Sequence, residues 1–335
     1  MLFTTCFLLL INHLRLAEGQ SADSANFFAT SDWDLFNDYV TTYDRHYRTQ
    51  AEQLHRFHAF RASLARIESL NAEDPNQPYG LTIFSDLTES EFRDQYLGYS
   101  PAPSPSAHET EADLTTYRVE HLPRRFDWRN VKNTVTPVKD QGQCGSCWAF
   151  STTENIESVW AIYGPKQSLT KLSVQQIVDC ESHSNGCQGD TTTAAYDYVL
   201  KAGGLESEED YRYTAKDQRC RFRQSNVVAR IDGFERVGRN ETEMMLYLYN
   251  RAPLSVCVDA ISWQHYRGGV MMKRCGTELG HCVLVTGYDM KGSVPYWIVR
   301  NSWGTKWGEN GYIHLEMFRD ECGLATEARS AYILK

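Results

Sequence analysis

The sequence lacks several features that would place it in a common class of protein. The apolar run near its N-terminus, Phe7 to Ile11, is far shorter than the roughly 20 residues of a membrane-spanning helix. No basic stripe with interleaved aromatic residues occurs, so nucleic acid is not an expected partner. No second closely spaced pair of cysteines or histidines is present to complete a zinc site with Cys144 and Cys147. We therefore predict no membrane span, no metal and no other cofactor.

The features that are present are typical of a secreted globular protein. The 335 residues, 41% of them hydrophobic, suffice for about two domains with appendages. The short apolar run and the small residues around Glu18 predict a signal peptide, residues 1–19. Its removal would take away Cys6 and leave nine of the ten cysteines, which fits an oxidising compartment. The sequon at Asn240 is a predicted glycosylation site. We expect passage through the secretory pathway to a lysosome-like acidic compartment or the extracellular space.

Charge is distributed unevenly along the chain. Residues 20–121 carry 7 Lys and Arg against 17 Asp and Glu, a net charge of −10. Residues 122–335 carry 26 against 25, a net charge of +1. Because carboxylates have reference pKa values near roughly 4, acidification toward that range would discharge the N-terminal part. We expect charge pairing between the two parts, and within the N-terminal part, to weaken in this acidic range.

A candidate nucleophile, Cys147, lies in the stretch from Gln141 to Ser151. A thiol with a reference pKa near roughly 8.5 needs a helix N-terminus or an imidazolium to hold it as the thiolate. No Gly or Pro follows Cys147 until Gly164 and Pro165, which predicts a helix of about four turns that begins at the cysteine. The unpaired N–H groups and the dipole of that helix would face the sulfur.

A candidate base and its partner lie far downstream. His281 stands at the head of an apolar, β-branched run, and Asn301 follows a second such run. An imidazole that serves a cysteine nucleophile needs a third polar group to fix its tautomer, and an amide can do so without competing for the proton. The pair Cys144 and Cys147 also permits a redox motif or half of a metal site. The many other cysteines disfavour the redox motif, and the missing second ligand pair disfavours the metal site.

These stretches together resemble the papain-like cysteine peptidases of the cathepsin L type. The resemblance rests on Gln-Gly-Gln-Cys-Gly-Ser-Cys-Trp at 141–148, Gly-His-Cys at 280–282 and Asn-Ser-Trp-Gly at 301–304. It covers the chain almost completely from Leu122 onward. It implies a protease that acts on proteins and peptides, and we expect a monomer.

The resemblance also implies a role for each candidate catalytic residue. Cys147 would attack the peptide carbonyl, His281 would transfer protons, and Asn301 would hold the imidazole. The side-chain amide of Gln141 and the backbone N–H of Cys147 would stabilise the oxyanion. Trp303 would cover the hydrogen bond between His281 and Asn301. An inactive homologue that persists as a binding or inhibitory module is the alternative.

An α+β fold is predicted for the mature region, residues 122–335. Residues 132–230 carry helical patterns, including 172–180 and 193–200. Residues 231–335 carry strand patterns at 254–258, 283–286, 296–299, 312–315 and 331–334. The resemblance implies a papain-like fold, in which an α-rich domain carries the cysteine, a β-barrel-like domain carries the histidine and asparagine, and substrate lies extended between them.

The region before the mature part predicts a helical inhibitor. Apolar residues at helical spacing predict helices over about 33–47 and 51–71. The second helix matches the interrupted motif of cathepsin L-type inhibitory prosegments, with Ser63 in place of Asn. Residues 79–88 match the second motif, with Thr82 in place of Asn. The resemblance implies an inhibitory prosegment over residues 20–98. The polar, proline-containing residues 99–121 predict an exposed linker in which, or just beyond which, maturation cleaves.

The resemblance implies three disulfides, which spacing alone would not select. These are Cys144–Cys187, Cys180–Cys220 and Cys275–Cys322. Cys257 and Cys282 remain. By their positions in the motifs we expect them to line the pocket for P2, the second substrate residue before the scissile bond. They would form a fourth disulfide or a close thiol pair, the alternative being two buried free thiols.

The remaining substrate-binding candidates also come from the resemblance. Gly189 and Asp190 stand where the family has two glycines, the second of which pairs its backbone with substrate. Asp190 would either leave this pairing intact and add an acidic rim or change the backbone φ. Thr192 would form part of the P2 pocket wall, and Glu327 would lie at its floor. A carboxylate there implies a pocket that accepts basic as well as apolar residues.

Overall fold

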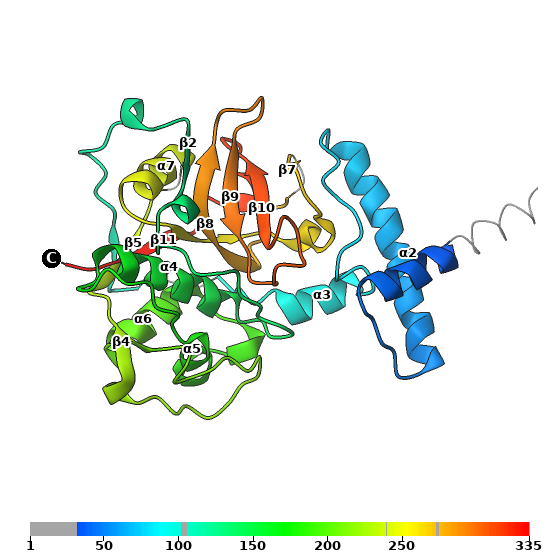
Figure 1. Ribbon diagram of the computed structural model, residues 1–335, viewed down its shortest axis with the longest axis horizontal. Helices are drawn as coiled ribbons and strands as arrows, with labels where there is room; N and C mark the ends of the chain where they lie inside the picture. The colour runs from blue at the N-terminus through cyan, green and yellow to red at the C-terminus, as the bar shows by residue number, and fades with distance from the viewer. Residues whose placement is uncertain (1–31, 102–105, 239, 273–274, 335) are drawn as a thin grey trace, which may run out of the picture.

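The structure is a computed structural model that describes residues 32–101, 106–238, 240–272 and 275–334. The predicted signal peptide and its cleavage site lie outside the described residues. Among the helices of the described residues, none is long and apolar enough to cross a membrane. The fold is α+β, as predicted from the sequence. Figure 1 shows the helices α4, α5 and α6 gathered below the strands β8, β9 and β10.

Three helices form the α-rich half of the C-terminal part: α4 (Cys147–Tyr163), α5 (Val174–Cys180) and α6 (Thr192–Ala202). Helix α4 begins at Cys147 and ends before Gly164, as its sequence predicts. Most of its side chains are buried on all sides, so α4 is the central helix of the fold. Two acidic residues on α4 form ion pairs: Glu154 pairs with the buried Arg300 at 2.7 Å, and Glu157 pairs with Lys139 at 2.6 Å.

A long sheet forms the β-rich half, with strand order β1-β5-β11-β6-β8-β9-β10-β7, and β2 also pairs with β8. Strand β8 is buried along its whole length, which explains its nearly continuous apolar sequence. The strands are β1 (Glu109–Glu111), β2 (Arg125–Asp127), β5 (Gly233–Arg236), β6 (Leu254–Val258), β7 (Val270–Met271), β8 (His281–Asp289), β9 (Tyr296–Arg300), β10 (Tyr312–Glu316) and β11 (Ala328–Tyr332). A separate pair comprises β3 (Leu205–Glu206) and β4 (Val227–Ala229), and helix α7 (Glu241–Asn250) belongs to the β-rich half. Short 3-10 turns are η1 (Val119–His121), η2 (Trp128–Asn130), η3 (Gly186–Gln188), η4 (Gln224–Asn226), η5 (Ile261–His265) and η6 (Glu321–Gly323).

We define residues 32–121 as the N-terminal segment. It contains a helix over residues 32–42, followed by α2 (Gln50–Glu73) and α3 (Glu89–Tyr96). The first helix ends earlier than its aromatic pattern predicts, because the later aromatics Tyr43 and Tyr47 lie in the turn that packs back on it. In Figure 1, α2 lies at one end of the molecule and α3 connects it to the mature region. The segment therefore has a small aromatic core of its own, around Phe36, Tyr39 and Phe60.

Asp86 holds the N-terminal segment together from within. Its carboxylate is fully buried and accepts hydrogen bonds from the hydroxyls of Tyr39 and Tyr47 at 3.0 and 2.9 Å. The Arg45 guanidinium donates two more, at 2.8 and 3.0 Å. A buried carboxylate with four donors is fully satisfied, so Asp86 acts as a structural anchor for the N-terminal segment.

The described residues 106–121 of the predicted linker are mostly exposed, but part of this stretch forms a strand that its composition does not indicate. Strand β1 adds to the sheet by parallel pairing with β5, and the Ala112 N–H donates to the Arg236 carbonyl at 2.9 Å. Tyr99 is buried. Composition misled here because strand addition relies on main-chain hydrogen bonds, which need few apolar side chains.

Candidate active site

Cys147 is fully buried at the first turn of α4. The backbone N–H groups of Cys282, Gly98 and Trp148 face its sulfur and lower the pKa of the thiol, but burial outweighs them and raises this pKa to about 11. Cys147 is the only free cysteine of the described residues. In this state the thiol is protonated and unreactive.

His281 begins β8, and its neighbour Cys282 contacts the sulfur of Cys147 through the backbone. Its Nε2 lies 2.8 Å from Oδ1 of Asn301, an oxygen that also accepts the Ser302 N–H at 2.7 Å. Because this oxygen is an acceptor, Nε2 carries the proton and the buried Nδ1, which has no hydrogen-bond partner, is left free. Burial lowers the pKa of His281 to about 4, so the imidazole is neutral.

The Trp303 ring covers the imidazole as the sequence predicts. The two rings stack with centroids 4.6 Å apart and an interplanar angle of 27°. Both Trp303 and Asn301 are buried, so the hydrogen bond between His281 and Asn301 is shielded from water. Phe84, Phe92 and Tyr96 of the N-terminal segment pack edge-on against the same indole.

Gln141 is buried and held at both ends of its amide. Its Oε1 accepts the Ser302 hydroxyl at 2.7 Å, which orients Nε2. Nε2 donates to the Cys144 carbonyl at 2.8 Å and to the Tyr96 carbonyl at 3.1 Å. The amide expected to hold an oxyanion therefore already holds a carbonyl oxygen of the N-terminal segment.

Residues 96–100 of the N-terminal segment occupy the cleft between the two halves. The Asp190 N–H donates to the Gly98 carbonyl at 3.0 Å, and the Tyr99 N–H donates to the Gly280 carbonyl at 3.0 Å. A Cβ on Gly98 would lie 1.8 Å from the Gly145 carbonyl oxygen, so only glycine fits above the cysteine. The segment blocks the cleft with extended backbone, in the way a peptide would occupy it.

Asp190 keeps the backbone pairing that the family glycine would make. Its N–H bonds Gly98, its carbonyl accepts the Ser100 N–H at 3.4 Å, and it is not among the residues with positive φ. Its side chain turns to the Thr191 N–H at 2.6 Å, and burial raises the pKa of its carboxyl. Gly189 has a φ of 106°, which favours glycine. Thr192 begins α6 and is buried.

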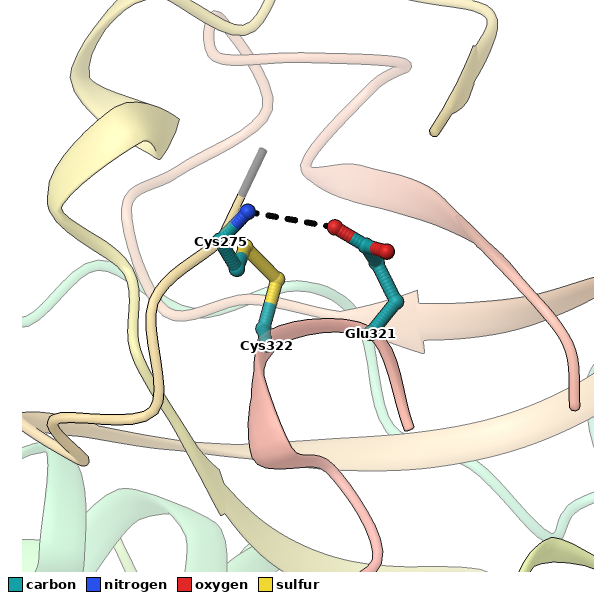
Figure 2. Close-up of side chains that lie close together, drawn as sticks. All are labelled: Cys275, Glu321 and Cys322. Atoms are coloured by element: carbon teal, nitrogen blue, oxygen red, sulfur yellow. Dashed lines mark hydrogen bonds between the residues drawn. A yellow bond between two sulfur atoms is a disulfide. The ribbon is translucent and has the colours of Figure 1, made fainter. Parts of the chain in front are cut away.

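The described residues form four disulfides. Three are those that the resemblance implies: Cys144–Cys187, Cys180–Cys220 and Cys275–Cys322. The fourth joins Cys257 and Cys282. Cys257 and Cys282 are directly opposite on the antiparallel strands β6 and β8, and both pack with Tyr99 and Cys147. Figure 2 shows Cys275 and Cys322 beside Glu321, whose carboxylate accepts the Cys275 N–H at 3.1 Å. Because these two sulfurs are bonded to each other, they offer no thiolate to a metal.

Glu327 is not the free carboxylate that an arginine-binding pocket requires. Its Oε1 accepts a hydrogen bond from Arg236 at 3.1 Å, and its Oε2 accepts one from Arg329. The prediction that Glu327 offers an available carboxylate to a basic P2 side chain is therefore wrong for this state of the protein. The sequence does not show this because Arg236 of β5 reaches Glu327 only through the pairing of β5 with β11, although Arg329 stands two residues after Glu327 in the chain.

Two other functional candidates also escaped the sequence analysis. Ser302 orients Gln141, and the Tyr213 hydroxyl donates to the Gln141 carbonyl at 2.8 Å. Ser302 lies beside Asn301 in the motif, so the sequence could have indicated it, whereas no local pattern indicates Tyr213.

Asn240, the predicted glycosylation site, is exposed and caps α7 by accepting the Glu243 N–H at 2.8 Å.

Comparison with known proteins gives the class. Residues 122–332 match the papain family cysteine proteases, and residues 36–92 match the cathepsin propeptide inhibitor domain. The chain is 38% identical over 303 residues to cysteine proteinase 1 of Dictyostelium discoideum, covering 84% of this chain and 88% of the relative. It is 40% identical over 298 residues to a senescence-specific cysteine protease of Oryza sativa subsp. japonica, covering 86% and 87%.

Solved structures agree with the sequence relatives. Digestive procathepsin L 3 of the Tenebrio molitor larval midgut is similar with a TM-score of 0.78 and 30% identity, over 90% of this chain and 99% of that one. Bromelain of Ananas comosus in complex with the E64 inhibitor is similar with a TM-score of 0.59 and 36% identity, over 64% of this chain and all of that one (100%).

The chain belongs to the papain family of cysteine proteases. It is a cysteine endopeptidase with a papain-like fold, made with an inhibitory propeptide. The N-terminal segment is accordingly called the prosegment below.

Proposed function

We propose that this enzyme hydrolyses peptide bonds by acyl transfer through Cys147, with His281 as the proton donor and acceptor. The observation that carries the proposal is the hydrogen bond from His281 to Asn301, which occupies Nε2 and leaves Nδ1 of the imidazole without a partner, while the next residue, Cys282, faces the Cys147 sulfur through its backbone N–H. The thiolate would attack the carbonyl and form a thioester, while the imidazolium protonates the leaving amine. Water activated by the imidazole would then release the acid.

The oxyanion would be held by the Gln141 amide and the backbone N–H of Cys147. The Gln141 amide is fixed by Ser302 and points at a peptide carbonyl in the zymogen, which supports this role. A donor that is fixed before the reaction needs no reorganisation when charge develops on the carbonyl oxygen.

The prosegment would inhibit by excluding both substrate and water. Gly98 stands against Cys147, and Tyr99 fills the pocket beside the Cys257–Cys282 disulfide. The neutral thiol and neutral imidazole of the zymogen are the result of burial, so opening the cleft would restore the charged pair. We place the maturation cut near Leu122, after the prosegment strand β1.

Substrate would lie extended along Asp190 and Gly280, which pair with the prosegment backbone in the zymogen. The P2 side chain would enter the pocket that Tyr99 fills, lined by Cys257 and Cys282. The apolar walls of this pocket would admit apolar P2 side chains. A basic P2 residue would find no unpaired carboxylate at Glu327, since Glu327 accepts hydrogen bonds from two arginines.

We further propose that the enzyme works as a monomer in a lysosome-like compartment or outside the cell. Four disulfides suit an oxidising compartment. An inactive binding module is the second candidate, but no observation favours it.

A test uses matured protein with a fluorogenic peptide that carries Leu at P2. The wild-type enzyme should cleave it, and Cys147→Ser should not. Equal cleavage by Cys147→Ser would contradict the proposal. No cleavage by either, with Cys147 no more reactive to alkylation than an ordinary thiol, would favour the inactive module.

A further inference from the structure

Two arginines face each other across the neighbouring strands β5 and β11. Arg236 on β5 and Arg329 on β11 are direct partners in an antiparallel ladder, so their side chains lie on one face of the sheet. Like charges directly opposite are destabilising unless counter-ions hold them. This pair is therefore a built feature that requires acidic partners.

Two carboxylates supply these partners in the zymogen. Glu327 bonds both guanidiniums, and Glu109 of the prosegment accepts a hydrogen bond from Arg329 Nε at 2.5 Å. The side chains of Arg329 and Glu109 are each 6% exposed. The cluster of Arg236, Arg329, Glu327 and Glu109 is thus neutral and nearly closed.

The cluster belongs to the pocket that takes the P2 side chain. The Cys257 N–H donates to the Glu327 carbonyl at 3.3 Å, which places the cluster beside the Cys257–Cys282 disulfide. Tyr99, which fills the pocket, is close enough for all four charges to act on its phenol. Burial and then Glu327 raise the pKa of its phenol to about 12, Glu109 also raises it, and both arginines lower it.

Maturation removes one carboxylate from this cluster. Glu109 lies in β1, before the proposed cut near Leu122, and leaves with the prosegment. Two guanidiniums then share the single carboxylate of Glu327, so the floor carries a net charge of +1. Two donors are left: Nε of Arg329, which loses Glu109, and Nε of Arg236, which is buried without a hydrogen-bond partner already in the zymogen.

From this we propose that the mature P2 pocket prefers an acidic side chain, with Arg329 and Arg236 as the specificity-determining residues. A substrate Glu would replace the prosegment Glu109 as counter-ion, since guanidinium donors match carboxylate oxygens and charge-assisted bonds are the stronger ones. A basic P2 residue would meet the excess positive charge and be disfavoured. This inference rests on the proposed function and names the substrate class of the same site.

The test compares kcat/KM of the matured enzyme for four peptide coumarylamides that differ only at P2: Leu, Gln, Glu and Arg. Assays near pH 6 keep the P2 glutamate ionised, because its reference pKa is about 4.3. We expect Glu to exceed its isostere Gln by about tenfold or more, the range of a charge-assisted hydrogen bond, and to exceed Arg by more. N-terminal sequencing of the matured enzyme should begin after Glu109.

Variants distinguish a change in the specificity of the pocket from a general loss of folding or activity. Arg329→Gln should bring the Glu to Gln ratio close to one, whereas Glu327→Gln should raise it, an increase that misfolding cannot produce. Arg125→Gln is the matched control, because Arg125 pairs with Asp289 at the far end of β8 from His281 and should leave the ratio unchanged. Arg favoured over Glu, a ratio near one in the wild type, or an N-terminus upstream of Glu109 would each overturn the inference. Cleavage of the Leu peptide with no preference for Glu would overturn the inference alone, whereas loss of all cleavage that depends on Cys147 would overturn the proposed function.

Discussion

Gln141 donates its side-chain amide to the carbonyl of Tyr96, 3.1 Å away, so the proposed oxyanion donor is occupied by the protein's own prosegment. The same segment places Gly98 against Cys147 and Tyr99 in the P2 pocket. Inhibition and catalysis therefore use the same groups, and the prosegment must leave before any of them is available to substrate.

Replacement of Gln141 by Ala should lower kcat of the matured enzyme by about 10²–10³, the usual cost of one oxyanion donor. Alkylation of Cys147 should remain, because the thiol and imidazole are untouched. Gln218→Ala removes an amide of the same kind from an exposed site and is the control. A loss under about threefold for Gln141→Ala would exclude it from the oxyanion site.

The thiol of Cys147 should be far less reactive in the zymogen than in the matured enzyme. Burial raises the pKa of this thiol to about 11, so at neutral pH almost none is thiolate. The rate of iodoacetamide labelling of Cys147, followed by peptide mapping, should rise with pH well above neutrality in the zymogen. In the matured enzyme labelling should already be fast at mildly acidic pH. Identical pH profiles for the two forms would contradict this account.

Acidification should open the zymogen, and Glu91 should contribute to the effect. Burial alone would raise the pKa of Glu91, but hydrogen bonds from Thr88 and Arg56 outweigh burial and lower it. A lowered carboxyl pKa stabilises the prosegment above the unfolded value of about 4.3, and that stability is lost as pH falls through the folded pKa. We expect self-maturation to be faster near pH 4.5 than near pH 7, because the many carboxylates of the prosegment begin to discharge there, and to accelerate further below about pH 4.3, where the contribution of Glu91 is lost.

Glu91→Gln should mature faster than the wild type near neutral pH, because Arg56 loses its charged partner at 2.8 Å. Glu89→Gln is the control, since Glu89 is exposed and lies 3.5 Å from Arg93 only. Both variants lose one negative charge from α3, so a difference between them reports the hydrogen bonds rather than net charge. Equal maturation rates at the two pH values in the wild type would contradict the acid trigger.

The Cys257–Cys282 disulfide should stabilise the matured enzyme and shape its pocket. A bond that closes a loop of this size, 25 residues apart in sequence, typically contributes about 2–4 kcal/mol. The double variant with Ser at both positions should therefore unfold at a lower temperature in calorimetry. Mass spectrometry of unreduced peptides should show the two cysteines joined, and finding both alkylated in the wild type would rule the bond out.

The sequence predicted the features that depend on local pattern. Helix α4 begins at Cys147 and ends before Gly164 as expected, and β6 has the predicted bounds, because Gly, Pro and β-branched residues act within a few positions. The juxtaposition of Cys147, His281 and Asn301 was not readable from periodicity. It came from resemblance to a family whose motifs the chain retains.

The sequence failed where contacts join distant strands. Glu327 was placed near the pocket, but the approach of Arg236 to Glu327 and of Glu109 to Arg329 is set by the register of β11 with β5 and of β5 with β1. No local signal encodes such a register. Strand β1, within the predicted linker, was missed for the same reason, since strand addition depends on the exposed edge of β5 rather than on apolar composition.

The account depends most directly on Cys147 as the nucleophile. The matured enzyme should be titrated with substoichiometric iodoacetamide, with residual cleavage of a Leu-P2 peptide measured beside intact mass and peptide maps. We predict that activity falls in proportion to one modification per molecule and that the modified residue is Cys147. Full activity after Cys147 is alkylated, or inactivation that maps to another residue, would contradict the account.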